Sequence, residues 1–186
     1  MPFSAIFLDR DGTINRELEY LHRIADFAYE KEVPQALQVL RALCDHLVVV
    51  TNQSGIGRGY YRQEQMDELN RFMVDDLRDR YDVAIDAIYH CPHHPSRDGE
   101  CLCRKPLPGM LLQAAREHGI DLQRAWIIGD KDADILAGYA AGCQGGILVQ
   151  TGHGREYDNF TPPQERPFAF QRCATLLEAA RFLQDQ

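Results

Sequence analysis

The chain has 186 residues, of which 45% are hydrophobic and 26% charged, and its formal net charge is -8. This length and composition fit one globular domain over residues 1–186 with a single sizeable core. The acidic balance argues against a nucleic-acid partner, and no stretch approaches the roughly 20 apolar residues that a membrane span needs.

The N-terminal segment MPFSAIFLDRDG lacks the basic start and the long apolar run of a signal peptide. We therefore expect a cytoplasmic protein, and we expect it to be a monomer. In a reducing cytosol, the six cysteines are metal ligands or buried thiols rather than disulfides. Cys44 and Cys143 lie alone in apolar surroundings and are predicted to be small core residues.

Five short apolar runs, each followed by turn residues, predict strands over residues 5–8, 47–50, 85–89, 126–128 and 146–149. Helical spacing of apolar residues predicts helices over 34–44, 63–81, 108–118 and 133–141. A last helix is predicted to start at Thr175, with Glu178 completing a capping box. Strands that are apolar without strict alternation, and that alternate with helices, indicate an α/β fold with a mostly parallel sheet covered on both faces. Residues 151–167, rich in Gly, Pro and charge, are predicted to form a mobile loop.

The first strand runs directly into DRDGT, which places Asp9 and Asp11 two residues apart at a strand end. Two such carboxylates can converge on one cation while a third acid comes from elsewhere, and Mg²⁺ favours a sparse carboxylate site of this kind. Ligands of open α/β sheets bind at the carboxyl ends of the strands. An acidic turn without a ligand is the alternative for this motif taken alone.

The second strand ends in TNQSGIGRG, whose hydroxyl, amide and backbone N–H groups can cradle phosphate oxygens. The segment has neither the lysine of a P-loop nor the spacing of a dinucleotide-binding motif. We therefore expect phosphate binding here without either of the two common nucleotide-binding motifs.

Three cysteines and two histidines fall within CPHHPSRDGECLC, residues 91–103. Cys91, His93, Cys101 and Cys103 give four ligands suited to tetrahedral Zn²⁺ with no open position, which indicates a structural rather than a catalytic metal. Spacing alone does not decide between His93 and His94, and His90 is a further competitor. Arg104 and Lys105 follow at once, and a lysine retained in an arginine-rich chain suggests that a compact point charge is required there.

FLDRDGT after a buried strand resembles the first motif of the haloacid dehalogenase (HAD) superfamily of phosphatases. This resemblance implies that Asp9 is the nucleophile that attacks phosphorus. Asp11 would be the general acid and base, which protonates the leaving alcohol and then activates water against the aspartyl-phosphate. Thr51 would hold the transferring phosphoryl group, and Lys105 would offset the charge on the nucleophile and the phosphoryl oxygens.

The fourth strand ends in GDKDAD, which matches the fourth motif of the same superfamily. Asp130 would then join the Asp9 carboxylate and the Asp11 backbone carbonyl as ligands of a catalytic Mg²⁺. Asp134, one helical turn further, would support the ion without binding it. Asp132 is expected to point elsewhere as a charge at the helix start.

A narrower resemblance rests on CPHHP, CLCRKPLPGM, TNQSGIGRG and DRDGTIN. Over residues 4–152 the chain looks like the zinc-containing D-glycero-D-manno-heptose 1,7-bisphosphate 7-phosphatases. This implies Mg²⁺-dependent removal of the 7-phosphate from a phosphorylated sugar used in lipopolysaccharide synthesis, a zinc loop at 91–103 and no large cap domain. The matching zinc ligands are Cys91, His93, Cys101 and Cys103. The matching substrate-binding residues are Glu17, Tyr20, Asn52, Gln53, Ser54, Arg104 and Lys131.

One position departs from the relatives, because Glu19 stands where they carry a small residue.

Two other functions are retained as alternatives. Histidinol-phosphate phosphatases share DRDGT and a similar zinc loop, and a zinc-stapled binding module without catalysis would need only the cysteine cluster.

Overall fold

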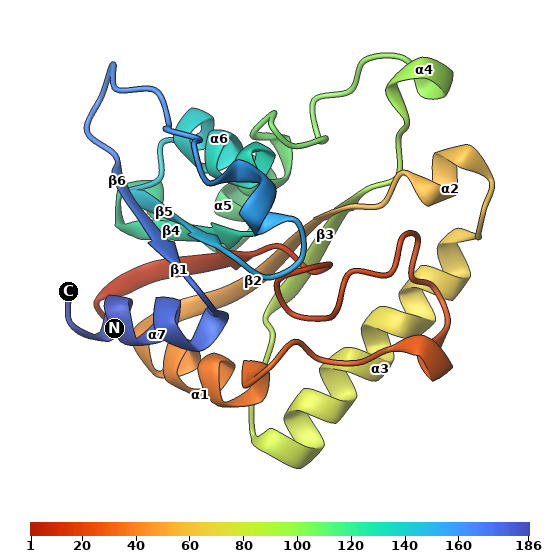
Figure 1. The fold of residues 1–186 in the computed structure, drawn as a ribbon, viewed down its shortest axis with the longest axis horizontal. Coiled ribbons are helices and arrows are strands. Elements are labelled where there is room, and N and C mark those ends of the chain that lie inside the picture. The colour runs from red at the N-terminus through yellow and green to blue at the C-terminus, as the bar shows by residue number, and fades with distance from the viewer.

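The computed structural model describes residues 1–186 and is built on a six-stranded sheet in the order β3-β2-β1-β4-β5-β6, in which every pair of neighbours is parallel (Figure 1). The strands are β1 (Phe3–Leu8), β2 (Cys44–Asn52), β3 (Ala87–Cys91), β4 (Ala125–Gly129), β5 (Gly145–Val149) and β6 (Ala169–Cys173). The predicted α/β fold with a parallel sheet is confirmed. Strand β6 was not predicted, because this edge strand is mostly half-exposed and carries polar side chains in place of an apolar run.

Helices cover both faces of the sheet, which gives the three layers seen in Figure 1. One layer contains α1 (Val33–Leu43), α3 (Gln63–Tyr81) and α7 (Leu176–Gln184), and the other contains α5 (Gly109–His118) and α6 (Asp132–Ala141). The short helices are α2 (Gly55–Arg58), α4 (Pro95–Asp98) and the 3₁₀ turns η1 (Ile24–Asp26), η2 (Leu122–Arg124) and η3 (Gly154–Tyr157). None of the helices combines the length and the apolarity that crossing a bilayer requires.

Strand β1 shows why the central strands are apolar on both sides. Its Ile6 and Leu8 side chains join the core cluster under α1 and α7, while Ala5 and Phe7 join the cluster under α5 and α6. All four side chains are fully buried. Burial of both faces removes the need for alternation, and the continuous apolar run follows from it.

The predicted helix boundaries are close to the observed ones, with two local differences. Cys44 is buried as predicted, but it begins β2 instead of ending the first helix. The Thr175 hydroxyl accepts the amide of Glu178 at 3.2 Å, whereas the Glu178 carboxylate accepts the amide of Ala174 rather than that of Thr175. The last helix is therefore capped by Thr175 with a return bond shifted by one residue.

The topology creates a crevice at the carboxyl ends of β1 and β4. The chain continues from β1 to β2 on one side, and β4 pairs with β1 on the other side, with Leu8 opposite Ile128. Such a switch point leaves a gap between the loops that diverge from it. The residues that follow β1 and β4 therefore meet at this point.

Candidate active site

A buried lysine connects the carboxyl ends of β1 and β2 with the first turn of α6 at the bottom of this crevice. The Nζ atom of Lys105 donates to Asp9 Oδ1 at 2.8 Å and to the Val50 carbonyl at 2.6 Å, and it lies 2.5 Å from Asp134 Oδ1. Lys105 is 3% exposed. Burial lowers the pKa of Lys105, but the carboxylates of Asp134 and Asp9 outweigh it and raise the pKa above its ordinary value. The ammonium is thus held as a fixed positive charge beside Asp9.

Asn52, the last residue of β2, fixes the backbone of this lysine. Its Nδ2 donates to the Lys105 carbonyl at 3.0 Å, and its Oδ1 accepts the Lys105 amide at 3.1 Å. The arrangement explains how a lysine on a loop after the cysteine cluster reaches a strand end that is distant in sequence.

Three carboxylates, those of Asp9, Asp130 and Asp134, have oxygens within 4.8 Å of one another. Both oxygens of Asp134 are engaged, one by Lys105 and the other by the amide of Lys131 at 3.0 Å. Asp130 Oδ2 accepts the amide of His153 at 2.8 Å, but Asp130 Oδ1 is buried and has no hydrogen-bond partner. An unpaired buried carboxylate oxygen calls for a ligand.

Burial, together with Asp9 and Asp134, raises the pKa of Asp130 to about 8. A divalent cation between Asp9 and Asp130 would offset this repulsion and would give the free oxygen a partner. The donor set, all oxygen and sparse, fits Mg²⁺. Gly12 makes the geometry possible, because its φ is +81° and a Cβ there would lie 2.3 Å from Asp130 Oδ2.

The Asp11 carboxylate lies outside this cluster and is oriented by a separate set of donors. Arg10 bonds to its two oxygens at 3.1 and 3.0 Å, Asn15 Nδ2 donates at 2.9 Å and Gln53 Nε2 donates at 2.7 Å. The Arg10 side chain is completely buried and is held in turn by Asn70 at 2.8 Å. Asp11 is therefore a positioned carboxylate that borders the cavity without belonging to the group around Lys105.

A cavity of about 320 Å³ opens above these residues. Every residue predicted for substrate binding or for catalysis lines it, namely Asp9, Asp11, Glu17, Tyr20, Thr51, Asn52, Gln53, Ser54, Arg104, Lys105 and Lys131. Glu19 lines it too. Asp130, which is predicted only as a metal ligand, is fully buried and does not line the cavity. The structure therefore gathers the predicted residues at one site.

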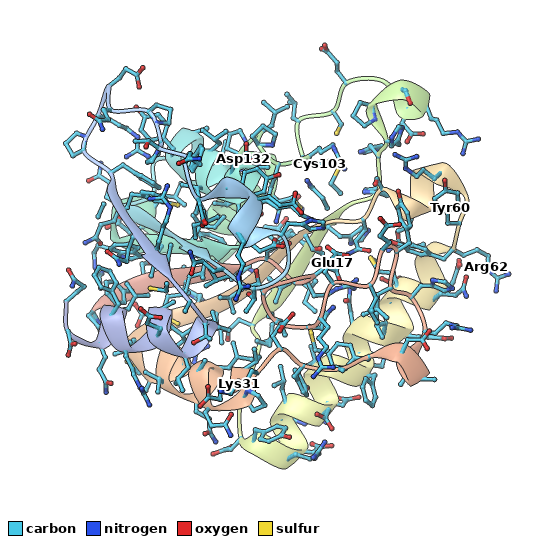
Figure 2. The ribbon with its side chains drawn as sticks, in the orientation of Figure 1. Glu17, Lys31, Tyr60, Arg62, Cys103 and Asp132 are labelled. Atoms are coloured by element: carbon cyan, nitrogen blue, oxygen red, sulfur yellow. The ribbon has the colours of Figure 1, made fainter.

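Asp132 requires a correction. It stands in the first turn of α6, as expected of a charge at a helix start, but it also lines the cavity instead of pointing elsewhere. Figure 2 labels Asp132 together with Glu17, from the loop after β1, and Cys103, from the loop before α5. The first turn of a helix that begins at a strand end lies at the crevice, so its side chains can face the cavity.

The cysteine cluster lies next to this cavity, after β3. Cys91 Sγ is 3.6 Å from both Cys101 Sγ and His93 Nδ1, and Cys103 Sγ is 3.1 Å from Cys91 Sγ and 3.3 Å from His93 Nδ1. Ligands on a tetrahedral Zn²⁺ at about 2.3 Å lie about 3.8 Å apart, so four soft atoms at these spacings fit that ion. None of the six cysteines of the chain forms a disulfide.

The structure distinguishes between the competing histidines. His94 Nδ1 pairs with the Ser96 hydroxyl at 2.8 Å, and His90 Nε2 pairs with Gln63 at 3.0 Å, so both rings are engaged away from the sulfur atoms. Only His93 contributes a ring nitrogen to the cluster. Its carbonyl accepts Arg104 NH1 at 3.3 Å, which ties the cluster to a residue of the cavity wall.

Sequence reasoning missed several residues of the site. Arg10 and Asn15 orient Asp11, and the Tyr61 hydroxyl fixes Gln53 by donating to its Oε1 at 2.5 Å. His153 and Tyr157 line the cavity from the connection between β5 and β6. Arg10 lies within the DxDG motif and Asn15 three residues after it, so both could have been suspected on that ground, whereas nothing in the sequence marks the other three.

The fold and the site define a HAD-like hydrolase. A family model described as HAD-hydrolase-like matches residues 102–177. The structure superposes with a TM-score of 0.86 on the D,D-heptose 1,7-bisphosphate phosphatase from B. bronchiseptica, solved with magnesium and phosphate, at 33% identity over 98% of this chain and 99% of that one. It also resembles a HAD-like phosphatase from Mesorhizobium loti, with a TM-score of 0.81 at 33% identity over 97% of this chain and 87% of that one.

Two curated relatives narrow the class further. The D-glycero-beta-D-manno-heptose-1,7-bisphosphate 7-phosphatase of Pasteurella multocida is 49% identical, over 80% of this chain and 82% of the relative. The corresponding alpha enzyme of Photorhabdus laumondii is 44% identical, over 79% and 82%. The chain belongs to the D-glycero-D-manno-heptose-1,7-bisphosphate 7-phosphatase family, as its motifs suggested.

Proposed function

We propose that this protein removes the 7-phosphate from D-glycero-D-manno-heptose 1,7-bisphosphate through an aspartyl-phosphate on Asp9. The observation that carries the proposal is the buried Lys105 ammonium, 2.8 Å from Asp9 Oδ1, at the bottom of a cavity lined by polar side chains. The identity of the substrate is inferred from the names of the relatives given above. A phosphoryl group seated at Asp9 would leave the sugar chain extending into the cavity.

In the proposed reaction, an Asp9 oxygen attacks phosphorus while the bond from phosphorus to the sugar C7 oxygen breaks. Asp11, held by Arg10, Asn15 and Gln53, gives its proton to the departing oxygen. Asp11 then takes a proton from the water that attacks the aspartyl-phosphate, which releases inorganic phosphate and restores Asp9. Lys105 balances negative charge throughout, and Thr51 with the neighbouring strand-end groups positions the phosphoryl oxygens.

We further propose Mg²⁺ as the catalytic cofactor, bound by Asp9, the Asp11 backbone carbonyl and Asp130. When bound, the ion would neutralise charge on the phosphoryl oxygens. The unpartnered Asp130 Oδ1 supports this assignment, and so does the magnesium in the B. bronchiseptica structure. The first turn of α6 would then hold Asp134 close to the ion but bound to Lys105 rather than to metal.

A structural Zn²⁺ on Cys91, His93, Cys101 and Cys103 completes the proposal. The four ligand atoms face one another and leave no open position for a substrate.

We propose a monomeric, cytoplasmic enzyme that binds a phosphorylated sugar and no nucleic acid. Cysteines used as metal ligands and buried thiols fit a reducing compartment, and the net charge of -8 disfavours a polyanion.

A substrate panel tests this proposal. Phosphate release should be measured with Mg²⁺ for both anomers of heptose 1,7-bisphosphate, for heptose 7-phosphate and for histidinol phosphate. We expect one heptose bisphosphate anomer to give the highest kcat/KM. Hydrolysis of histidinol phosphate at an equal or higher kcat/KM would instead assign the chain to histidine metabolism. The relatives include one enzyme named for the alpha anomer and one named for the beta anomer, so the panel also decides the anomer preference of this protein.

A further inference from the structure

The segment that follows β5 forms a fixed wall of the substrate cavity. The Thr151 hydroxyl donates to the Gly12 carbonyl at 2.6 Å, and the amide of His153 donates to Asp130 Oδ2 at 2.8 Å. Gly152 approaches so closely that a Cβ on it would lie 2.6 Å from the Gly12 Cα. This part of the expected mobile loop is therefore fastened to both strand-end loops that carry the reacting groups, and its side chains project from an anchored backbone.

The imidazole of His153 is oriented within this wall. Its Nδ1 lies 2.9 Å from Oε1 of Glu156, in the 3₁₀ turn η3 that His153 precedes, and its Nε2 lies 3.6 Å from Glu17 Oε2. The ring lines the cavity, and its side chain is 36% exposed. A separation of 3.6 Å exceeds a hydrogen bond, so Nε2 retains its capacity for another polar partner.

The position of this ring complements the polar groups on the other side of the site. Arg104 and Lys105 enter from the loop after β3, where Lys105 is committed to Asp9. On the β4 and β5 side, Lys131 pairs with Glu17 at 3.3 Å, which leaves His153 Nε2 as a nearby ring nitrogen without a hydrogen bond. A sugar phosphate with its phosphoryl group at Asp9 carries several hydroxyls that need partners along this side.

We propose that His153 is a specificity-determining residue, whose Nε2 hydrogen-bonds a hydroxyl of the polyhydroxylated chain of the substrate. This inference rests on the proposed function, because it requires a sugar phosphate in the cavity. His153 takes no part in phosphoryl transfer. Glu156 has a positioning role, since it holds the ring through Nδ1 and directs Nε2 into the cavity.

The side chain can be tested without disturbing the proposed metal site. Asp130 is bonded by the backbone amide of His153, which His153→Ala and His153→Gln both retain. His153→Ala should raise KM for heptose bisphosphate about three- to tenfold, the loss of one neutral hydrogen bond, and should leave kcat within about twofold. His153→Gln should recover part of the loss, because its amide can replace Nε2 as a polar group.

p-Nitrophenyl phosphate separates a substrate contact from a structural effect, because it fills the phosphoryl site and carries no hydroxylated chain. Its kcat/KM should be unchanged in His153→Ala. His46→Ala, in β2 near its amino end, is the matched control and should leave the kinetic constants for both substrates unchanged. An unchanged KM for heptose bisphosphate in His153→Ala, or equal losses on both substrates, would overturn the role of His153. If the unaltered protein shows no preference for heptose bisphosphate over p-nitrophenyl phosphate, the proposed function fails and this inference falls with it.

Discussion

Two clusters of potential metal ligands lie at the carboxyl edge of the sheet, the carboxylates after β1 and β4 and the cysteines after β3, and they differ in which ligand atoms they leave without a partner. In the carboxylate cluster, Asp130 Oδ1 has no partner and Asp9 lines an open cavity. In the cysteine cluster, each ligand atom faces the other ligands, and none of the four residues lines that cavity. The comparison teaches that closeness of metal ligands does not mark the reactive centre. An incompletely satisfied group beside a cavity does.

The largest effect in this comparison is expected when the nucleophile is removed from the carboxylate cluster. Asp9→Asn keeps the shape of the side chain but not its nucleophilic oxygen, so kcat should fall by about 10⁴-fold or more. Phosphate release under saturating Mg²⁺ measures the effect. Asp79→Asn, on the exposed side of α3, is the control and should retain full activity. A kcat for Asp9→Asn close to that of the control would overturn the role of Asp9 as the nucleophile.

The next largest effect is expected for the charge beside the nucleophile. Lys105→Met removes the ammonium that bonds to Asp9 and Asp134, and kcat should fall by about 10²- to 10³-fold. Lys31 provides a matched control, because its side chain is 81% exposed and pairs only with Glu32. Lys31→Met should keep kcat, and circular dichroism should show that both variants are folded. Similar kcat values in the two variants would contradict the role of Lys105.

Disrupting the cysteine cluster should have a smaller effect on catalysis, and a different one. Cys103→Ser should lose the bound zinc and lower the urea midpoint of unfolding. It should raise KM by about tenfold through displacement of Arg104. The change in kcat should be smaller, because Asn52 holds the backbone of Lys105 independently of the metal. Metal analysis and steady-state kinetics measure the two effects.

Cys173→Ala is the control for the zinc variant, because this thiol is buried in the core cluster under α1 and α7. It should keep a full complement of zinc. If Cys103→Ser lost its zinc and kept the KM of the unaltered protein, the cluster would have no part in placing Arg104.

The smallest expected effect is the contribution of Asp130, in the carboxylate cluster, to the pH dependence of stability. In magnesium-free protein, burial and the neighbouring carboxylates raise the pKa of Asp130 from 3.8 to about 8. Between these values the folded state holds a proton that the unfolded chain has released, so stability falls as pH rises through this window. The urea midpoint should therefore be lower at pH 9 than at pH 6.

Asp130→Asn should reduce this slope, and saturating Mg²⁺ should do the same, because binding requires the carboxylate form. Urea titrations of zinc-loaded protein at both pH values measure the slope. An identical slope in the variant and in the unaltered protein would show that Asp130 does not carry it.

Much of the site was predictable, because its residues follow strands in recognisable patterns. Asp9, Thr51 and Asp130 come directly after apolar runs, and parallel strands bring such positions to one edge of the sheet. Spacing alone did not decide between His93 and His94, since the choice depends on which ring turns toward the sulfur atoms; the family resemblance gave His93. Strand β6 was missed because pairing with β5, rather than its own composition, makes it a strand.

Contacts that depend on tertiary approach were beyond the sequence as well. His153 lies far from the catalytic motifs, and only the close approach of Gly152 to Gly12 brings it to the cavity. Arg10 stands between two acids in the sequence, and its side chain is completely buried. Burial of such a group is decided by the partners that the fold supplies, here Asp11 and Asn70.

The carboxamide of Asn52 bonds to both the amide and the carbonyl of Lys105, as a neighbouring strand would. The chain leaves the sheet at Cys91, and Asn52 fixes its backbone again at Lys105. The position of Lys105 therefore does not depend on the path of the chain between these two residues. Residues 95–100 are exposed along that path. Insertions and deletions there can accumulate over evolution without moving the catalytic ammonium, so this stretch is where relatives can diverge in length while they retain the same chemistry.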